Sequence, residues 1–349
     1  MRRGLISRSP VELPDAVLEG RLDRLRAAMR DAQLDALAVY TNNTRPAGVS
    51  WLTGFVPYWS EALLVVPRDG APLLVAALSF RVKSWIERTS RIGEILHYPR
   101  IGLKAAQQIA SVKKSAVLGV VDFDGLPTGI ADDLREGGPE LVLRDASALF
   151  AGLRGKADPA EIALAGKSAR MAHQALAHAQ GDTLNAMIAA VEHRARLFGA
   201  EEIYVAAAPD LSRRGTLVRI EGEQVLGETY ALRATVAYKG TWVRLVRTFC
   251  PAGLAQRAAA RLAEAVAHLP SDRGFAGFSS WLVEGCRMAQ PLEALMGARL
   301  SAADPPLPGA LVSVQGALTL DGGTVLVGAP ALLGGPGEPA SLLIDPLYE

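Results

Sequence analysis

Residues 225–253 have the sequence VLGETYALRATVAYKGTWVRLVRTFCPAG, and they decide the fold of the second half of the chain. The central part, YALRATVAYKGTWVRLVRTF, predicts two strands around a turn, yet it contains the cations Arg233, Lys239, Arg244 and Arg247. Because alternate residues of a strand point to opposite faces, some of these cations must point toward whatever the sheet covers. Burying a charge without a partner is costly, so either the sheet is more open than its composition indicates or an anion lies there.

The composition indicates a folded protein without a strong overall charge. The length of 349 residues predicts about two domains, and because half of the residues are hydrophobic, each domain can have a full core. Lys and Arg total 37 and Asp and Glu total 36, so no net field attracts nucleic acid or an anionic membrane surface. No apolar run is long enough to span a membrane, and the N-terminus lacks the apolar stretch of an export signal. We therefore expect a cytoplasmic protein with neither a nucleic-acid nor a membrane partner.

Helices and strands alternate over residues 1–153, which predicts a layered α/β domain. An amphipathic helix, with apolar positions at intervals of three and four, begins at Leu18. Strands are expected at residues 35–40 and on both sides of Asp69-Gly70, a pair that indicates a hairpin between its apolar flanks.

Residues 154–349 form a second predicted domain, which begins with two helices. Pro159 fits the first position of one helix, and Gly199 fits the residue after the end of the next. Strands then dominate, including one expected at TLVRI, residues 216–220, and late strands in ALVSVQGALTL and TVLVGAPALL. Helices followed by mostly antiparallel strands are typical of α+β folds.

The order and spacing of these segments resemble the creatinase, prolidase and aminopeptidase P family. The similarity covers most of the chain and is carried by the opening helix, DALAVY, VSWLTGF, ALLVVPRDG, LRGKADPAEIALAGKSARMAHQAL and the stretch quoted first. The resemblance implies an α/β N-terminal domain followed by an α+β pita-bread (creatinase/aminopeptidase-like) C-terminal domain.

The metal ligands of the family are replaced in this sequence. Metal-dependent members carry Gly-Asp-x-x-x-x-Asp and then Gly-Tyr-x-x-Asp-x-x-Arg-Thr, and the resemblance places the two ligand aspartates at Arg233 and Arg244. The two later glutamates of the family fall at or near Gln315 and Gly328, and no histidine follows His268. Arginine neither loses its proton nor offers a lone pair, so a dinuclear metal centre is not expected, and neither is any other cofactor.

Creatinase resembles this family without using a metal, so its catalytic positions would allow a metal-independent activity. The resemblance implies a histidine near Thr216 and a glutamate at Val246, and this chain has neither. Creatine hydrolysis is therefore not supported, and no catalytic residue is assigned.

Arginines at the former ligand positions suit an anion. A pair of guanidinium groups binds a carboxylate, phosphate or sulfate in bidentate geometry. Alternatively, internal acids such as Glu284 or Glu293 neutralise the arginines and turn the former metal site into a structural ion-pair plug. The candidate ligand-binding residues are Arg233, Arg244, Arg247 and Gln315.

Two hypotheses for the function follow. The first is a non-catalytic pseudoenzyme that binds a small anionic ligand or acts as a partner subunit, in a homodimer or in a heterodimer with a family member. The second is a metal-independent hydrolase or lyase that acts on a small amide or amidine. A titratable group within hydrogen-bond reach of an open arginine-lined cavity would favour the enzyme, and a filled pocket the scaffold.

The other histidines and cysteines are interpreted as structural. His173 and His178 are five positions apart, not the four that aligns two ligands on a helix, and His193 adds no regular spacing. Cys250 and Cys286 have no histidine assigned beside them, so inert thiols are expected. Two cysteines also cannot build a disulfide framework, which fits a reducing compartment.

Overall fold

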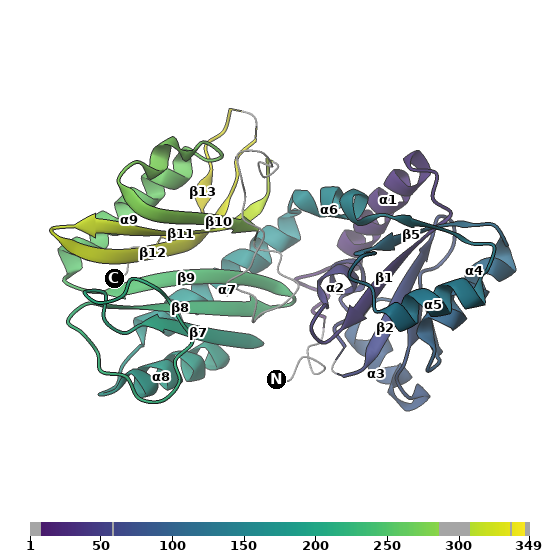
Figure 1. Cartoon of the computed structure of the whole chain (residues 1–349), viewed down its shortest axis with the longest axis horizontal. Helices are drawn as coiled ribbons and strands as arrows, with labels where there is room; N and C mark the ends of the chain where they lie inside the picture. The colour runs from purple at the N-terminus through teal and green to yellow at the C-terminus, as the bar shows by residue number, and fades with distance from the viewer. Residues whose placement is uncertain (1–7, 58, 286–307, 336, 346–349) are drawn as a thin grey trace. The chain divides into compact units, whose positions relative to one another are not determined.

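The computed structural model describes residues 8–57, 59–285, 308–335 and 337–345 (Figure 1). The chain divides into two compact units, Met1–Arg154 and Gly155–Glu349. No helix among the described residues is both long and apolar enough to cross a membrane.

The first unit is a six-stranded sheet with helices on both faces. The strand order is β4-β3-β2-β1-β5-β6, in which β2 pairs antiparallel with β1 and β3, and the other neighbours are parallel. The elements are α1 (Asp15–Asp31), β1 (Ala36–Asn42), α2 (Ala47–Thr53), β2 (Glu61–Pro67), β3 (Leu73–Ala76), the 3-10 turn η2 (Phe80–Val82), α3 (Lys83–Thr89), β4 (Glu94–His97), α4 (Ile101–Val112), β5 (Val117–Val121), α5 (Thr128–Gly137), β6 (Val142–Asp145) and α6 (Ser147–Gly155).

Strand alternation builds two cores in this unit. Leu37 and Val39 of β1 pack in the core with α1, α2 and α6, whereas Ala38 faces the core formed with α4 and α5. The hairpin expected around Asp69-Gly70 is confirmed as β2 and β3. The predicted α/β class of the first half of the chain is therefore confirmed.

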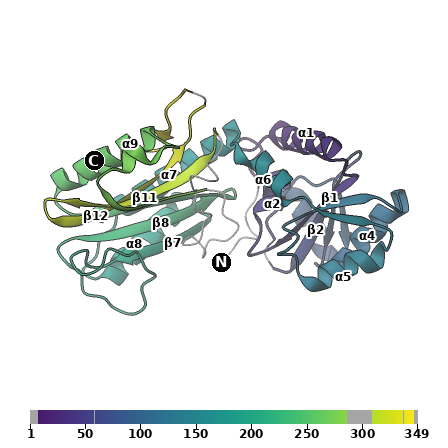
Figure 2. The same ribbon diagram turned by 45° about the horizontal axis from the view of Figure 1, so that its top comes forward.

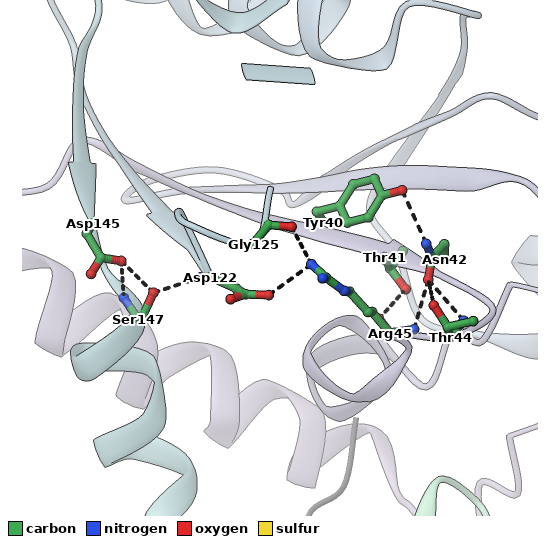
Figure 3. A network of polar contacts seen from close by, with 9 residues as sticks. All are labelled: Tyr40, Thr41, Asn42, Thr44, Arg45, Asp122, Gly125, Asp145 and Ser147. Carbon is green, nitrogen blue, oxygen red and sulfur yellow. Dashed lines mark hydrogen bonds and ion pairs between the residues drawn. The ribbon is translucent and has the colours of Figure 1, made fainter. Parts of the chain in front are cut away.

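Polar contacts join the segments that follow β1, β5 and β6 (Figure 3). The Asn42 carboxamide oxygen accepts hydrogen bonds from the backbone N–H groups of Thr44 and Arg45 at 2.9 and 2.8 Å. Arg45 then donates to the Asp122 carboxylate at 3.1 Å, and the Ser147 hydroxyl accepts from the Asp122 N–H at 2.8 Å. These contacts tie together the carboxyl ends of three neighbouring parallel strands.

The second unit is an antiparallel sheet, with α7 and α9 lying along it (Figure 2). The strand order is β10-β11-β12-β9-β8-β7, and β13 pairs with β12. The elements are α7 (Pro159–Ala177), α8 (Leu184–Leu197), β7 (Glu202–Ala208), β8 (Tyr230–Tyr238), β9 (Thr241–Phe249), α9 (Ala252–Ala267), the 3-10 turn η3 (Asp272–Phe275), β10 (Phe278–Gly285), β11 (Leu311–Leu320), β12 (Gly323–Leu332) and β13 (Ser341–Leu342).

Local sequence signals explain the start of this unit and its central hairpin. Asp158 and Glu161 form a reciprocal capping box at the first turn of α7, which begins at Pro159 as predicted. Lys239 and Gly240 both have positive φ, 48° and 75°, and they form the two-residue turn between β8 and β9. Turns of this kind match the twist of the strands that they join.

Two predictions about the strands were wrong. TLVRI forms no strand, because Val218 makes only an isolated bridge to Ala207 and the segment is exposed or half-buried along its length. Conversely, β10 was not predicted, because Ser279, Ser280 and Trp281 are exposed at the edge of the sheet and hide the alternation.

Candidate functional site

The two faces of the second sheet differ in chemistry. Leu232 and Ala234 of β8, with Val243 and Leu245 of β9, belong to the core shared with α7, α8 and α9. The residues between them point to the opposite face, because successive side chains of a strand alternate. This opposite face, called the polar face below, carries Arg233, Arg244, Glu284, Ser313 and Gln315.

Strand register aligns Arg233, Gly328 and Gln315, three of the positions where the family resemblance implies metal ligands, in one row across the sheet. Arg233 pairs with Val246, and Val246 pairs with Gly328 of β12. Gly328 in turn lies opposite Gln315 of β11, and Gln315 lies opposite Leu282 of β10. Positions far apart in the sequence therefore meet on the polar face.

Arg244 forms a buried ion pair with Glu284. One of its terminal nitrogens donates to the Glu284 carboxylate, and both side chains are only 1% exposed. The proposed neutralisation of an arginine by Glu284 is thus confirmed for Arg244, whereas Glu293 lies outside the described residues. Solvent does not screen a pair at this depth, so removal of either partner leaves a buried charge behind.

Arg233 has a different environment, because its hydrogen-bond partner is neutral. Its Nη1 donates to Oε1 of Gln315 at 3.3 Å, and among the described residues its Nε has no acceptor. The residue is 6% exposed, and this burial lowers the pKa of the guanidinium to about 10. Arg233 is thus a desolvated cation held by an amide.

Polar atoms of Glu284 and Ser313 nearby are also buried, with no hydrogen-bond partner among the described residues. They are Oε1 of Glu284 and Oγ of Ser313, and Ser313 lies opposite Glu284 in the β10–β11 register. Buried polar atoms in folded proteins are nearly always satisfied by protein or water, so unsatisfied ones mark a place where a polar guest fits.

A pocket of about 200 Å³ adjoins this cluster. Gln315 is one of its lining residues, and Val246, the register partner of Arg233, is another. Neither arginine lines the pocket, and the described residues of its lining include no acid, histidine, cysteine or lysine. Its lining also includes Leu217, Ser280, Trp281, Leu282, Ala317, Leu326 and Val327.

The residues at the former ligand positions do not fit a metal ion. Guanidinium groups at Arg233 and Arg244 have no lone pair to donate, and Gly328 has no side chain. A Cβ at Gly328 would lie 2.8 Å from the carbonyl oxygen of Val314 and 2.9 Å from Cγ of Gln315, so a larger residue has no room there. In the described part of the chain, no three His, Cys, Asp or Glu side chains are grouped so that they could hold a metal ion.

Arg247 lies on the other face of the sheet. Its guanidinium is stacked over the ring of Phe249, 5.1 Å from the centroid, and its charge helps lower the pKa of His173 on α7. The main cause of that lowered pKa is burial, and Asp345 opposes it. The structure therefore brings Arg233, Arg244 and Gln315 together but separates Arg247 from them.

Cys250 is a free thiol next to the end of β9. Burial raises its pKa, and the opposing charge of Arg247 does not reverse this. A thiol with a raised pKa is a weak nucleophile at neutral pH, which agrees with the structural interpretation of this residue. Cys286 lies outside the described residues.

Comparison with known proteins decides the family of the first unit. Residues 21–155 match the family model of the creatinase/prolidase N-terminal domain. The first unit is a creatinase/prolidase N-terminal domain. A search of curated proteins found no match to the chain.

The creatinase/prolidase likeness extends over both units in solved structures. The prolidase from Pyrococcus horikoshii OT3 aligns with a TM-score of 0.69 at 14% identity, covering 93% of this chain and 97% of that one. The X-Pro aminopeptidase from Thermotoga maritima MSB8 gives 0.69 at 13% identity, covering 92% and 96%. The N-terminal domain of FACT complex subunit SPT16 from Eremothecium gossypii gives 0.66 at 15% identity, covering 96% and 97%.

These comparisons confirm the resemblance inferred from the sequence at the level of the fold. The chain has a creatinase-like α/β unit followed by a pita-bread unit, and Arg233, Arg244 and Gln315 lie on the polar face of the latter. Sequence reasoning missed the apolar pocket beside Gln315 and the close packing at Gly328. The pocket depends on register across four strands, β9 to β12, a feature that no local pattern reveals.

Proposed function

We propose that this chain is a non-catalytic creatinase/prolidase-like protein that binds a small anionic ligand at Arg233 and Gln315. The observation that supports this most directly is the buried cation of Arg233, whose hydrogen bond goes to a neutral amide. An arriving anion would supply the charge that the amide lacks, and charge-assisted hydrogen bonds are about twice as strong as neutral ones.

Arg244 takes a structural role in this proposal. Its ion pair with Glu284 occupies the position of a former ligand and holds β9 and β10 in place. A buried pair of this kind fixes geometry more than it adds stability. We therefore assign ligand binding to Arg233 and Gln315, treat Arg244 as their support, and leave Arg247 out.

The alternative, a metal-independent hydrolase or lyase for small amides or amidines, has less support. General acid–base catalysis requires a titratable group within hydrogen-bond reach of the substrate. Within the part of the chain that the structure describes, the lining of the pocket beside Gln315 supplies a serine and an amide but no such group. Binding without turnover agrees better with this lining.

A role as a partner subunit is compatible with ligand binding. One of the similar structures is, by its name, part of a subunit of the FACT complex. We propose a cytoplasmic homodimer, or a heterodimer with a related chain. Size-exclusion chromatography with light scattering tests this, and a strict monomer that recruits no related chain would remove it.

A thermal-shift screen of the purified chain tests ligand binding. Acetate, sulfate and phosphate are the probes, and at least one should raise the melting temperature by mass action. The shift should disappear in Arg233→Met and persist in Arg257→Met, because the Arg257 side chain is 52% exposed and lies on α9, which packs against the opposite face of the sheet. Equal shifts in all three proteins would show that Arg233 does not bind the anion.

Elemental analysis of protein purified without chelator tests the absence of metal chemistry. The expected result is no stoichiometric manganese, cobalt, zinc or iron, since the residues at the former positions cannot act as ligands. Two tightly bound ions per chain would overturn the assignment.

A further inference from the structure

The pocket beside Gln315 is lined by both polar and apolar groups, and most of its apolar side chains belong to one cluster. Leu217, Leu282 and Leu326 contribute its large side chains, and Val246 and Ala317 contribute small ones. Val246, Ala317 and Leu326 also belong to one hydrophobic cluster on this face, with Leu217 packed against it. A guest in the pocket would therefore exchange water for hydrocarbon contacts.

Gln315 connects the apolar pocket to the buried cation. Its side chain lines the pocket, and its Oε1 is the acceptor for Arg233 at 3.3 Å, near the long end for a hydrogen bond. Rotation of this amide would open Arg233 to a stronger acceptor, and the amide N–H₂ would then be able to donate to the same guest.

We propose that the ligand is a monocarboxylic acid with a compact, branched hydrocarbon body. Its carboxylate pairs with Arg233 and takes a hydrogen bond from Gln315, and its hydrocarbon part fills the pocket formed by Leu217, Ala317 and Leu326. This inference rests on the proposed anion-binding function and specifies the chemical class of the ligand.

The charge of the cluster selects a monoanion. Among the described residues of the polar face, two guanidinium groups, Arg233 and Arg244, face one carboxylate, Glu284, which leaves one positive charge for the ligand to balance. A dianionic phosphate would bring a second negative charge close to Glu284, at a depth where charges are poorly screened.

The volume selects a small body. About 200 Å³ lies below the 300–1,000 Å³ typical of pockets for drug-sized ligands. A branched acid of four to six carbons suits this space, whereas acetate leaves most of it unused. Selectivity should therefore rise with the hydrocarbon part until the pocket is full.

Isothermal titration calorimetry on the full-length chain tests the inference with four probes. These are 3-methylbutanoate, its neutral counterpart 3-methylbutanamide, acetate and inorganic phosphate. We expect 3-methylbutanoate to bind about tenfold or more tighter than acetate, because each buried methylene group adds to affinity. The amide and phosphate should bind at least about tenfold more weakly than 3-methylbutanoate.

Two variants locate the two halves of the ligand. Arg233→Met should abolish binding of both acids, whereas Arg257→Met, the exposed control on α9, should leave both unchanged. Ala317→Leu fills the pocket and should reduce 3-methylbutanoate to the affinity of acetate without weakening acetate itself. Should Ala317→Leu fail to fold, the comparison of the acid with its amide and with acetate on the unaltered protein still decides the matter.

The outcomes separate this inference from the proposed function. If acetate or phosphate binds through Arg233 but 3-methylbutanoate binds no better than acetate, the apolar half is wrong and anion binding stands. Tighter binding of phosphate than of 3-methylbutanoate would refute the inference that the site prefers a monoanion. If none of the anions binds, both the inference and the proposed function fail.

Discussion

The buried pair of Arg244 and Glu284 gives the sharpest test of the site. The variants are Arg244→Met, Glu284→Leu and the combined Arg244→Met/Glu284→Leu. Each single change leaves one ionised group at a place where both side chains are 1% exposed, so water cannot replace the lost partner. Removal of one member of such a pair costs about 3–5 kcal/mol, whereas replacement of both by apolar residues is often nearly neutral.

The structure also supplies a matched control for this cycle. Arg257 and Asp321 form the same kind of pair in the same unit, but their side chains are 52% and 68% exposed. Arg257→Met and Asp321→Asn should each change the free energy of unfolding by less than about 1 kcal/mol. The contrast between the two pairs isolates burial as the cause.

Differential scanning calorimetry on the full chain is the suitable assay, because two units need not melt together. We expect the melting temperature of the second unit to fall strongly in both single variants. The combined variant should recover most of this loss. The coupling energy should be at least about 2 kcal/mol. Single variants that match the exposed control, or losses that simply add, would refute the assignment of a buried, mutually dependent pair.

Three further predictions address other positions. Arg233→Met should leave the free energy of unfolding unchanged or raise it by up to about 3 kcal/mol, because burial disfavours the charge of Arg233 in the folded chain but not in the unfolded one. A clear loss of stability in chemical denaturation would contradict this. Gly328→Ala should cost about 1–3 kcal/mol, because its Cβ meets the backbone oxygen of Val314, whereas the same change at Gly253, where a Cβ meets nothing within 4 Å, should not destabilise the chain. His173 has a lowered pKa, so the unfolded chain binds the proton more readily and stability falls as the pH drops through about 6.5. His173→Gln should flatten this dependence between pH 7 and 5 in unfolding curves, and an unchanged slope would exclude His173 as its source.

Local sequence signals were sufficient to predict most helices and strands, but not every strand or the pairing between distant strands. The β8–β9 hairpin follows from two apolar runs around Lys239-Gly240, and α7 follows from Asp158 and Pro159. Edge strands gave weaker signals, since β10 is exposed over Ser279–Trp281 and only its last residues are buried. Glu284 was named as a possible partner from its charge, yet its place opposite Ser313 depends on a strand that was not predicted.

The alternation of side chains along a strand predicts which arginines share a face of the sheet. Arg244 and Arg247 are an odd number of residues apart, so they cannot share a face of β9. The family resemblance instead grouped them, because in its motif the Arg-Thr pair follows the ligand closely. Physical alternation separates them, with Arg244 paired to Glu284 and Arg247 beside His173.

The change from carboxylates to arginines alters packing as well as ligation. Restoring aspartates at positions 233 and 244 would add two carboxylates beside Glu284, and no cation of the pair would remain to balance them. Gly328 would still lack room for a larger side chain, because Val314, Gln315 and Val246 surround it closely. The row across the sheet therefore holds a guanidinium group, an amide and close backbone packing, and this arrangement supports the proposed binding of an anion.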